Sequence, residues 1–240
     1  MPGPLALVGS GEFLAEMEAT DRLLLDAARP RAGHALIVPT ASALEPGMPE
    51  QWADRGINHF RDRLGIEARA VLILNHEMAD ERFVPLVQEA RFIYFSGGSP
   101  QHLVKSMAGS AFWAAVYARW RDGAALAGCS AGAMMLGAVL QNIVGRSNET
   151  PAALGVVPGI SLIPHFDRIE HYRPGALAAV REHRQTGITL LGVDELTAAL
   201  CIDGVWQVSG HGKVLVVSDE GEVTCAAGER LPLALPVAAG

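Results

Sequence analysis

Hydrophobic positions in the first half of the chain form short continuous runs that alternate with longer stretches of mixed character. The short runs are apolar on both faces, as in strands buried inside a sheet, and cover residues 5–8, 34–38, 67–74, 91–95 and 124–127. The stretches between them carry apolar residues at helical spacing, at 12–28, 49–64, 80–90 and 110–121. This alternation predicts a parallel sheet with helices on both faces, joined by right-handed crossovers.

Beyond about residue 155 the pattern changes to short apolar runs that are separated by tight turns. These runs cover residues 160–163, 188–193, 198–202, 205–209 and 213–218. The charged segment 167–184 is expected to form a helix, or a loop followed by a helix. The prediction is an α/β fold in three layers. Its doubly wound, mainly parallel sheet carries a mixed or antiparallel C-terminal extension, within a single domain over residues 1–240.

Composition and charge narrow the class of protein. The chain has 240 residues, of which 50% are hydrophobic and 19% charged, as in a compact globular protein. Its net charge of −7 argues against nucleic acid as a partner. The uncharged stretch 123–145 is long enough to span a membrane, but its glycines and polar residues favour strand, turn and helix. No membrane partner is therefore expected, and a homodimer is considered possible.

Cysteine usage and the start of the chain bear on compartment and cofactors. Cys129, Cys201 and Cys225 are widely spaced, with neither a Cys-x-x-Cys pair nor a zinc-binding spacing. The first residues lack the basic and apolar segments of a signal peptide. We therefore expect a cytoplasmic protein with no metal and no cofactor.

The most specific chemical signal is Gly128-Cys129-Ser130-Ala131-Gly132, a Gly-x-Ser-x-Gly sequence. It follows an apolar run and precedes a segment compatible with a helix, which is the context of a nucleophile elbow. The alternative interpretation is that Ser130 only caps a helix in a glycine-rich turn. In the functional interpretation Ser130 is the nucleophile, and the N–H group of Ala131 contributes to an oxyanion hole.

A second glycine turn, Ser96-Gly97-Gly98-Ser99-Pro100, ends the preceding strand. Ligands bind outside the carboxyl ends of the strands in an open parallel sheet, so this turn and the elbow are expected to face one crevice. The N–H of Gly98 is then a second oxyanion donor, unless the glycine pair serves only as a turn.

A serine nucleophile needs a base and an orienting acid. Among the eight histidines, His165 follows a short apolar strand and opens a polar segment, and His211 in Ser209-Gly210-His211-Gly212 is its rival. Asp194 and Glu195 close another buried strand and are the acid candidates. Asp167 and Glu149 are weaker candidates, and His34, His59 and His76 show no evident route to the crevice.

In these motifs, and in their order along most of the chain, the sequence resembles the serine peptidase family that contains dipeptidase E and cyanophycinase. The resemblance rests on Gly97-Gly98, the elbow at Gly128–Ala133, Pro164-His165-Phe166 and the segment from Gly192 to Ala198. It implies a class I glutamine-amidotransferase-like fold, with Ser130 as nucleophile and His165 as general base. Its branches place the acid differently, and the Asp-Glu-x-Thr-Ala match of the cyanophycinase branch implies Glu195.

The sequence departs from that family where a substrate would bind. Cyanophycinases carry several arginines after the His-Phe pair and a Gly-Gly-Asp-Gln turn, whereas here the turn ends in Gln101 and only Arg168 and Arg173 follow. Cyanophycin is therefore disfavoured as the substrate. Either arginine could hold a substrate carboxylate by paired hydrogen bonds, with Gln101 lining the pocket, or both could lie on a solvated helix face.

The function predicted from the sequence is a cofactor-independent serine peptidase, an exopeptidase or dipeptidase acting on short, Asp-containing or isoaspartyl peptides. One alternative is an α/β-hydrolase esterase that uses Ser130, Asp194 and His211. Another is a catalytically silent binding module of the same fold. An amidotransferase is disfavoured because the glutaminases of that fold use Cys, and Cys129 lies one position before the nucleophile.

Overall fold

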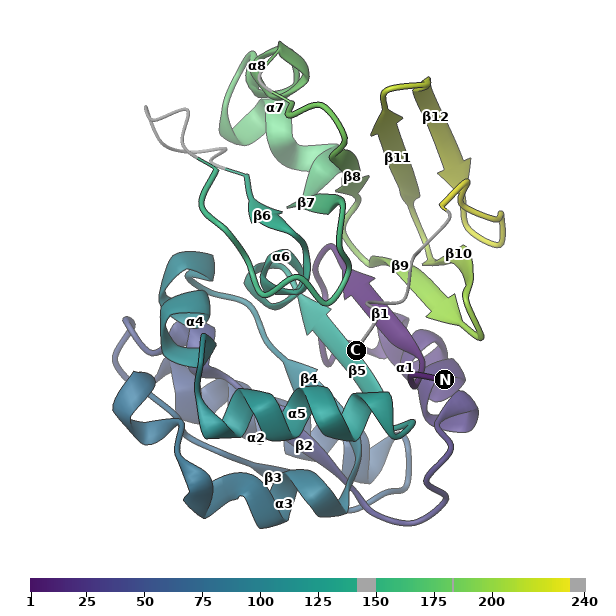
Figure 1. The fold of residues 1–240 in the computed structure, drawn as a ribbon. Helices are drawn as coiled ribbons and strands as arrows, with labels where there is room; N and C mark the ends of the chain where they lie inside the picture. The colour runs from purple at the N-terminus through teal and green to yellow at the C-terminus, as the bar shows by residue number, and fades with distance from the viewer. Residues whose placement is uncertain (142–149, 183, 234–240) are drawn as a thin grey trace.

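The computed structural model describes residues 1–141, 150–182 and 184–233, and its main feature is a seven-stranded sheet (Figure 1). The strand order is β10-β9-β1-β5-β4-β2-β3. The five strands β1 to β5 are parallel, and β9 and β10 extend the β1 edge in antiparallel fashion. Their bounds are β1 Leu5–Val8, β2 His34–Val38, β3 Ala68–Ala70, β4 Ala90–Phe95, β5 Ala125–Cys129, β9 Thr197–Ile202 and β10 Val205–Gly210.

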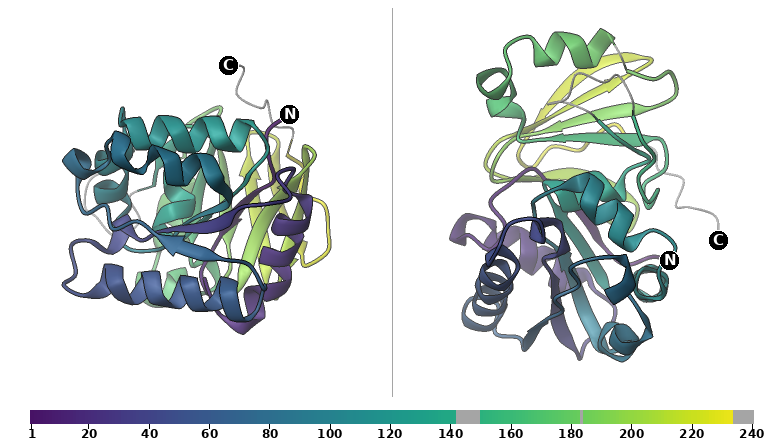
Figure 2. Two further views of the ribbon diagram at one scale, coloured as in Figure 1. Left: turned by 90° about the horizontal axis from the view of Figure 1, so that it is seen from below. Right: turned by 90° about the vertical axis from the view of Figure 1, so that its left-hand side faces the viewer.

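Helices cover both faces of this sheet, because its strands are apolar on both sides. In β2, Ala35 and Ile37 pack with α1 (Glu18–Ala27) and α2 (Met48–Asp62). The intervening Leu36 and Val38 pack into the core on the opposite face, as the two-residue period of a strand requires. Figure 2 shows the resulting layers. The helices on the opposite face are α3 (Val84–Glu89), α4 (Pro100–Met107), α5 (Ala111–Arg121) and α6 (Ala131–Leu136).

A second sheet of five strands, in the order β12-β11-β8-β7-β6, lies beside the carboxyl end of the first (Figures 1 and 2). Strands β6, β7 and β8 are parallel, and β11 and β12 are antiparallel additions. The bounds are β6 Val139–Leu140, β7 Ile160–Pro164, β8 Thr189–Val193, β11 Lys213–Ser218 and β12 Gly221–Ala226. Two short helices, α7 (Ile169–Tyr172) and α8 (Ala176–Glu182), pack on this sheet.

The α/β class with a mainly parallel sheet, helices on both faces and antiparallel strands in the C-terminal half is confirmed. Of the later apolar runs, only those at 198–202 and 205–209 extend the main sheet, and the others build the second one. The run at 67–74 is a strand only at Ala68–Ala70. Short 3-10 helices lie at Ala15–Met17, Thr40–Ser42, His76–Met78, Glu81–Phe83 and Phe166–Arg168.

Two further differences concern helices. The helix expected at 12–28 begins only at Glu18, because the chain first forms a loop in which Phe13 adopts a φ of 64°. Helix α4 was not predicted, although Ser99 caps its N-terminus and Pro100 occupies its first turn, which are ordinary start signals. No helix in the described part of the chain is long and apolar enough to cross a bilayer.

Candidate active site

Ser130 lies on the sharp turn between β5 and α6. Its N–H group donates to the carbonyl of Val8 on the neighbouring strand at 2.9 Å. Its backbone has φ 50° and ψ −109°, a conformation that L-residues rarely adopt. The flanking glycines allow α6 to approach the sheet: a Cβ on Gly128 would lie 2.3 Å from the carbonyl oxygen of Gly132, and one on Gly132 would lie 2.3 Å from that of Phe95. The Gly-x-Ser-x-Gly pattern is therefore a packing requirement of this turn.

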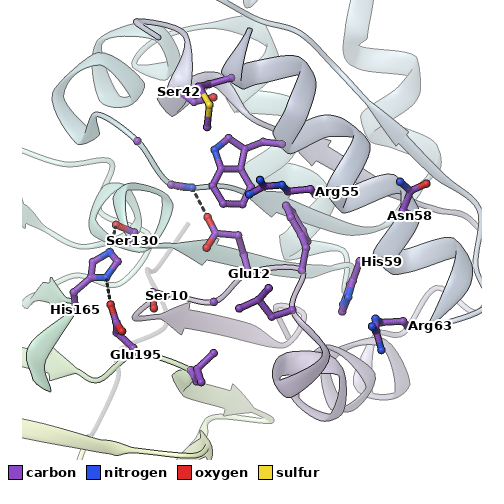
Figure 3. Close-up of a pocket in the computed structure, with 18 of the residues that line it drawn as sticks. Ser10, Glu12, Ser42, Arg55, Asn58, His59, Arg63, Ser130, His165 and Glu195 are labelled. Carbon is purple, nitrogen blue, oxygen red and sulfur yellow. Dashed lines mark hydrogen bonds and ion pairs between the residues drawn. The ribbon is translucent and has the colours of Figure 1, made fainter. Parts of the chain in front are cut away.

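Ser130, His165 and Glu195 form one hydrogen-bonded chain (Figure 3). His165 Nε2 lies 3.0 Å from Ser130 Oγ, and His165 Nδ1 lies 3.0 Å from Glu195 Oε1. His165 follows β7 and Glu195 follows β8. Because these strands are paired in parallel, with Pro164 opposite Val193, their carboxyl ends deliver the two side chains side by side. The site thus joins the elbow of the first sheet to two strand ends of the second.

Neighbouring groups hold Glu195 in place. The carboxylate of Asp167 accepts a hydrogen bond from the N–H group of Glu195 at 2.9 Å. Arg168 Nε lies 3.7 Å from Glu195 Oε2 and 3.6 Å from Asp167 Oδ2. The side chains of His165 and Glu195 are 34% and 30% exposed, so the ion pair is open to solvent on one side. Substrate can therefore reach the histidine from that side.

The rival acid and base lie elsewhere. Asp194 accepts a hydrogen bond from the N–H group of Lys213 at 2.9 Å, and burial raises the pKa of its carboxyl. The side chain of His211 is exposed, and within the described ranges its hydrogen bond is made by the backbone N–H group, to the carbonyl of Leu196. The esterase constellation of Ser130, Asp194 and His211 is therefore not assembled in this structure. Glu149 lies outside the described residues.

The three N-terminal histidines, His34, His59 and His76, take no part in the hydrogen bonds that link Ser130, His165 and Glu195. His59 is buried, and its Nε2 lies 2.9 Å from Asp21 Oδ2, but it lines the same pocket as Ser130, so the expectation that it has no route to the crevice is wrong (Figure 3). His34 is buried in β2, where desolvation lowers the pKa of its ring. His76 Nδ1 lies 3.2 Å from the carbonyl oxygen of Ser106.

The glycine turn after β4 lies directly against the elbow. A Cβ built on Gly97 would be 3.4 Å from Ser130 Cβ. Gly98 has a φ of 141° and packs so closely that a Cβ there would lie 2.3 Å from the carbonyl oxygen of Ala41. The N–H groups of Gly98 and Ala131 donate no hydrogen bond to any other residue in the described ranges. Both predicted oxyanion donors therefore remain available beside Ser130.

An open pocket of about 1170 Å³ extends from these residues across the N-terminal half of the molecule. Besides Ser130, His165 and Glu195, it is lined by the loop after β1, by one face of α2 and by the glycine turn. Gln101, Arg168 and Arg173, which the sequence suggested for substrate binding, do not line it. Gln101 is exposed on α4, and Arg168 faces the two carboxylates described above.

Sequence reasoning missed two pocket residues with distinctive chemistry. Arg55 projects from α2 into the pocket, with its guanidinium 4.9 Å from the ring centroid of Trp52 (Figure 3). Glu12 is a buried carboxylate in the loop after β1. Its position just beyond the carboxyl end of a parallel strand was a usable signal, because ligands bind at that edge of such sheets. Arg55 had no such signal in the sequence, because the helical spacing of α2 does not show that this position lines a pocket.

A serine on a strained strand-to-helix turn, hydrogen-bonded to a histidine that a carboxylate orients, defines a hydrolase of the serine type. Comparison with known families is more specific. The model of "Peptidase family S51" matches residues 5–208, and the chain belongs to this family. It is therefore a serine-type peptidase, as the sequence predicted.

Solved structures agree with this assignment. A peptidase from an acI-B1 Actinobacterium superposes with a TM-score of 0.88 at 33% sequence identity, covering 97% of this chain and 98% of that one. A putative peptidase E protein from Listeria monocytogenes EGD-e superposes with a TM-score of 0.59 at 16% identity, covering 96% of this chain and 100% of that one, and shows the same fold. None of the curated proteins compared with the chain matches it.

Proposed function

We propose that the protein hydrolyses short peptides through an acyl-enzyme on Ser130. The observation that carries this proposal is the position of His165, which lies 3.0 Å from both Ser130 Oγ and Glu195 Oε1. A histidine so placed can take the proton of the hydroxyl through Nε2, while the carboxylate at Nδ1 stabilises the imidazolium that forms.

The reaction divides into two steps. Ser130 Oγ attacks the scissile carbonyl carbon, and its proton passes to His165 Nε2. The N–H groups of Gly98 and Ala131 stabilise the oxyanion of the tetrahedral intermediate. The C–N bond then breaks, and His165 returns the proton to the leaving amine. Water activated by the same histidine hydrolyses the ester, which regenerates Ser130.

Recognition of a substrate carboxylate is the finer part of the proposal. Arg168 and Arg173 remain candidates from the sequence, because they follow His165 closely. Arg55 is added here because it lines the pocket that Ser130 opens into, and among the described residues its guanidinium contacts the Trp52 ring and forms no ion pair with a carboxylate. A guanidinium held over an aromatic ring can still offer its N–H groups for paired hydrogen bonds to a carboxylate. A short peptide with an Asp, isoaspartyl or terminal carboxylate suits this pocket.

The test combines active-site labelling with product analysis. The wild-type protein should be labelled on Ser130 by a serine-directed phosphonate, and Ser130→Ala should not be labelled. Wild type should also release free amino acids from a panel of aspartyl and isoaspartyl dipeptides, and Ser130→Ala should not. A folded wild-type protein that is neither labelled nor active on the panel would support the silent binding module instead.

A further inference from the structure

Glu12 is a buried carboxylate that contacts both chain segments around Ser130 without belonging to either. Its side chain comes from the loop after β1, and the residue is 7% exposed. Oε1 accepts a hydrogen bond from the N–H group of Gly97 at 2.9 Å, and Oε2 accepts one from Cys129 Sγ at 2.9 Å. Gly97 belongs to the glycine turn after β4, and Cys129 immediately precedes Ser130 in the chain.

Burying a carboxylate is unfavourable unless hydrogen bonds satisfy it, so this arrangement needs its two donors. The thiol can act as one of them, because burial and the neighbouring charge of Glu12 raise the pKa of Cys129 well above its usual range and keep the sulfur protonated. The fit around the carboxylate is tight. A Cβ on Gly97 would lie 3.1 Å from Glu12 Oε1 and 3.4 Å from Ser130 Cβ, so the three residues touch.

The contact of Glu12 with Gly97 has a specific effect on the turn. The peptide that links Gly97 to Gly98 lies between two glycines, whose backbone torsions resist rotation least. If this peptide flipped, a carbonyl oxygen would replace the Gly98 N–H group at the oxyanion position. The adjoining peptides are held on both sides: the N–H group of Gly97 by Glu12, and that of Ser99 by the carbonyl of Ala41 at 2.7 Å.

We propose that Glu12 is a positioning residue for the hydrolysis proposed above: its carboxylate holds the turn and the elbow together, so that the N–H group of Gly98 faces the oxyanion. The inference rests on the proposed function, since it assigns a role within that site. Both oxygens of the Glu12 carboxylate are engaged, one by the N–H group of Gly97 and the other by Cys129 Sγ. Glu12 acts through Gly97 and Cys129.

The test is a series of substitutions at Glu12, with Asp21→Asn as the matched control. Asp21 is also a buried acid, 1% exposed, but its carboxylate hydrogen-bonds to His59 and, among the described residues, to no group of the elbow or the turn. Glu12→Ala removes the acceptor, and Glu12→Asp withdraws it by one methylene. Glu12→Gln keeps an oxygen for the Gly97 N–H group and places an amide beside the sulfur, which is a weak acceptor. For each variant we would measure kcat, KM, the rate of phosphonate labelling and Tm.

We expect Glu12→Ala and Glu12→Asp to lower kcat and the labelling rate by about 10- to 100-fold, less than the loss of an entire oxyanion donor. KM should change by less than about threefold, because substrate binding is left intact. Glu12→Gln should stay within about threefold of wild type in kcat, and Asp21→Asn should leave kcat within the same range.

Three results would overturn the role of Glu12: full kcat in Glu12→Ala, an equal loss in Glu12→Gln and Glu12→Asp, or a loss in Asp21→Asn as large as that in Glu12→Ala. If Glu12→Ala does not fold, the comparison of Glu12→Gln with Glu12→Asp by itself decides whether Glu12 has this role. Failure of the proposed function gives a different result, because the wild-type protein itself would then resist phosphonate labelling.

Discussion

The backbone of Ser130 leads to a prediction about stability that is independent of the reaction. At φ 50° and ψ −109°, the residue occupies a region suited to glycine. Ser130→Gly and Ser130→Ala both remove the hydroxyl that His165 contacts, so their difference isolates the effect of the Cβ atom on this conformation. We expect the glycine variant to be the more stable of the two.

The magnitude follows from two opposing terms. A non-glycine residue held in such a region costs about 1–3 kcal/mol, which Ser130→Ala keeps and Ser130→Gly relieves. Glycine makes the unfolded chain more flexible, which offsets about 0.4–1 kcal/mol of that gain. The net advantage of glycine is therefore about 0.5–2 kcal/mol. In a chain of this size each kcal/mol moves Tm by about 2–4 °C, so Tm should differ by several degrees.

Thermal unfolding of the two variants, followed by calorimetry and circular dichroism, measures this difference. The control is Ala114→Gly, at an exposed position inside α5, where glycine should destabilise the protein by about 0.5–1 kcal/mol. The two substitutions thus shift Tm in opposite directions. If Ser130→Ala is as stable as Ser130→Gly, the elbow stores no strain and the reasoning fails.

Other predictions concern the base, the substrate and a buried acid. His165→Ala should lower kcat by several orders of magnitude and His211→Ala should leave it nearly unchanged; a severe loss in the latter would restore the esterase reading. Arg55→Ala should raise KM for acidic dipeptides by about 10- to 100-fold and leave KM for neutral dipeptides unaffected. If Arg168 binds the substrate carboxylate instead, Arg168→Ala should have this effect. Equal effects on both peptide classes would make the arginines structural. Burial raises the pKa of Asp194 above 3.8, so its ionisation opposes folding once the pH exceeds that value. Asp194→Asn should therefore stabilise the protein in urea at pH 7 and gain little below about pH 4, whereas a pH-independent gain would contradict this cause.

The elbow could be predicted from the sequence because all of its causes are local. A buried strand, a serine between two glycines and a helix follow one another within a few residues, and close packing of that helix on the sheet permits little but glycine at Gly128 and Gly132. His165 could be proposed for the same reason, since it stands at the end of an apolar strand. The S51 family assignment and the serine peptidase class, predicted from these motifs in their order, are confirmed.

The choice between Asp194 and Glu195 shows where sequence reasoning stopped. Adjacent residues at a strand end point in opposite directions, so only the pairing of β8 decides which acid meets the histidine. With β7 on one side and β11 on the other, Glu195 contacts His165 and Asp194 contacts the backbone of Lys213. The hydrophobic pattern could not show which acid faces His165, because β7 and β11, the two strands that flank β8, are both apolar.

The pocket and its buried carboxylate depended entirely on tertiary structure. Arg55 reaches the pocket because α2 packs against the first sheet, and Glu12 meets a glycine turn 85 positions further along the chain. The division of the C-terminal strands between two sheets has the same origin. Periodicity specifies which face of an element is buried, but the partner on that face is chosen by packing among segments far apart in sequence.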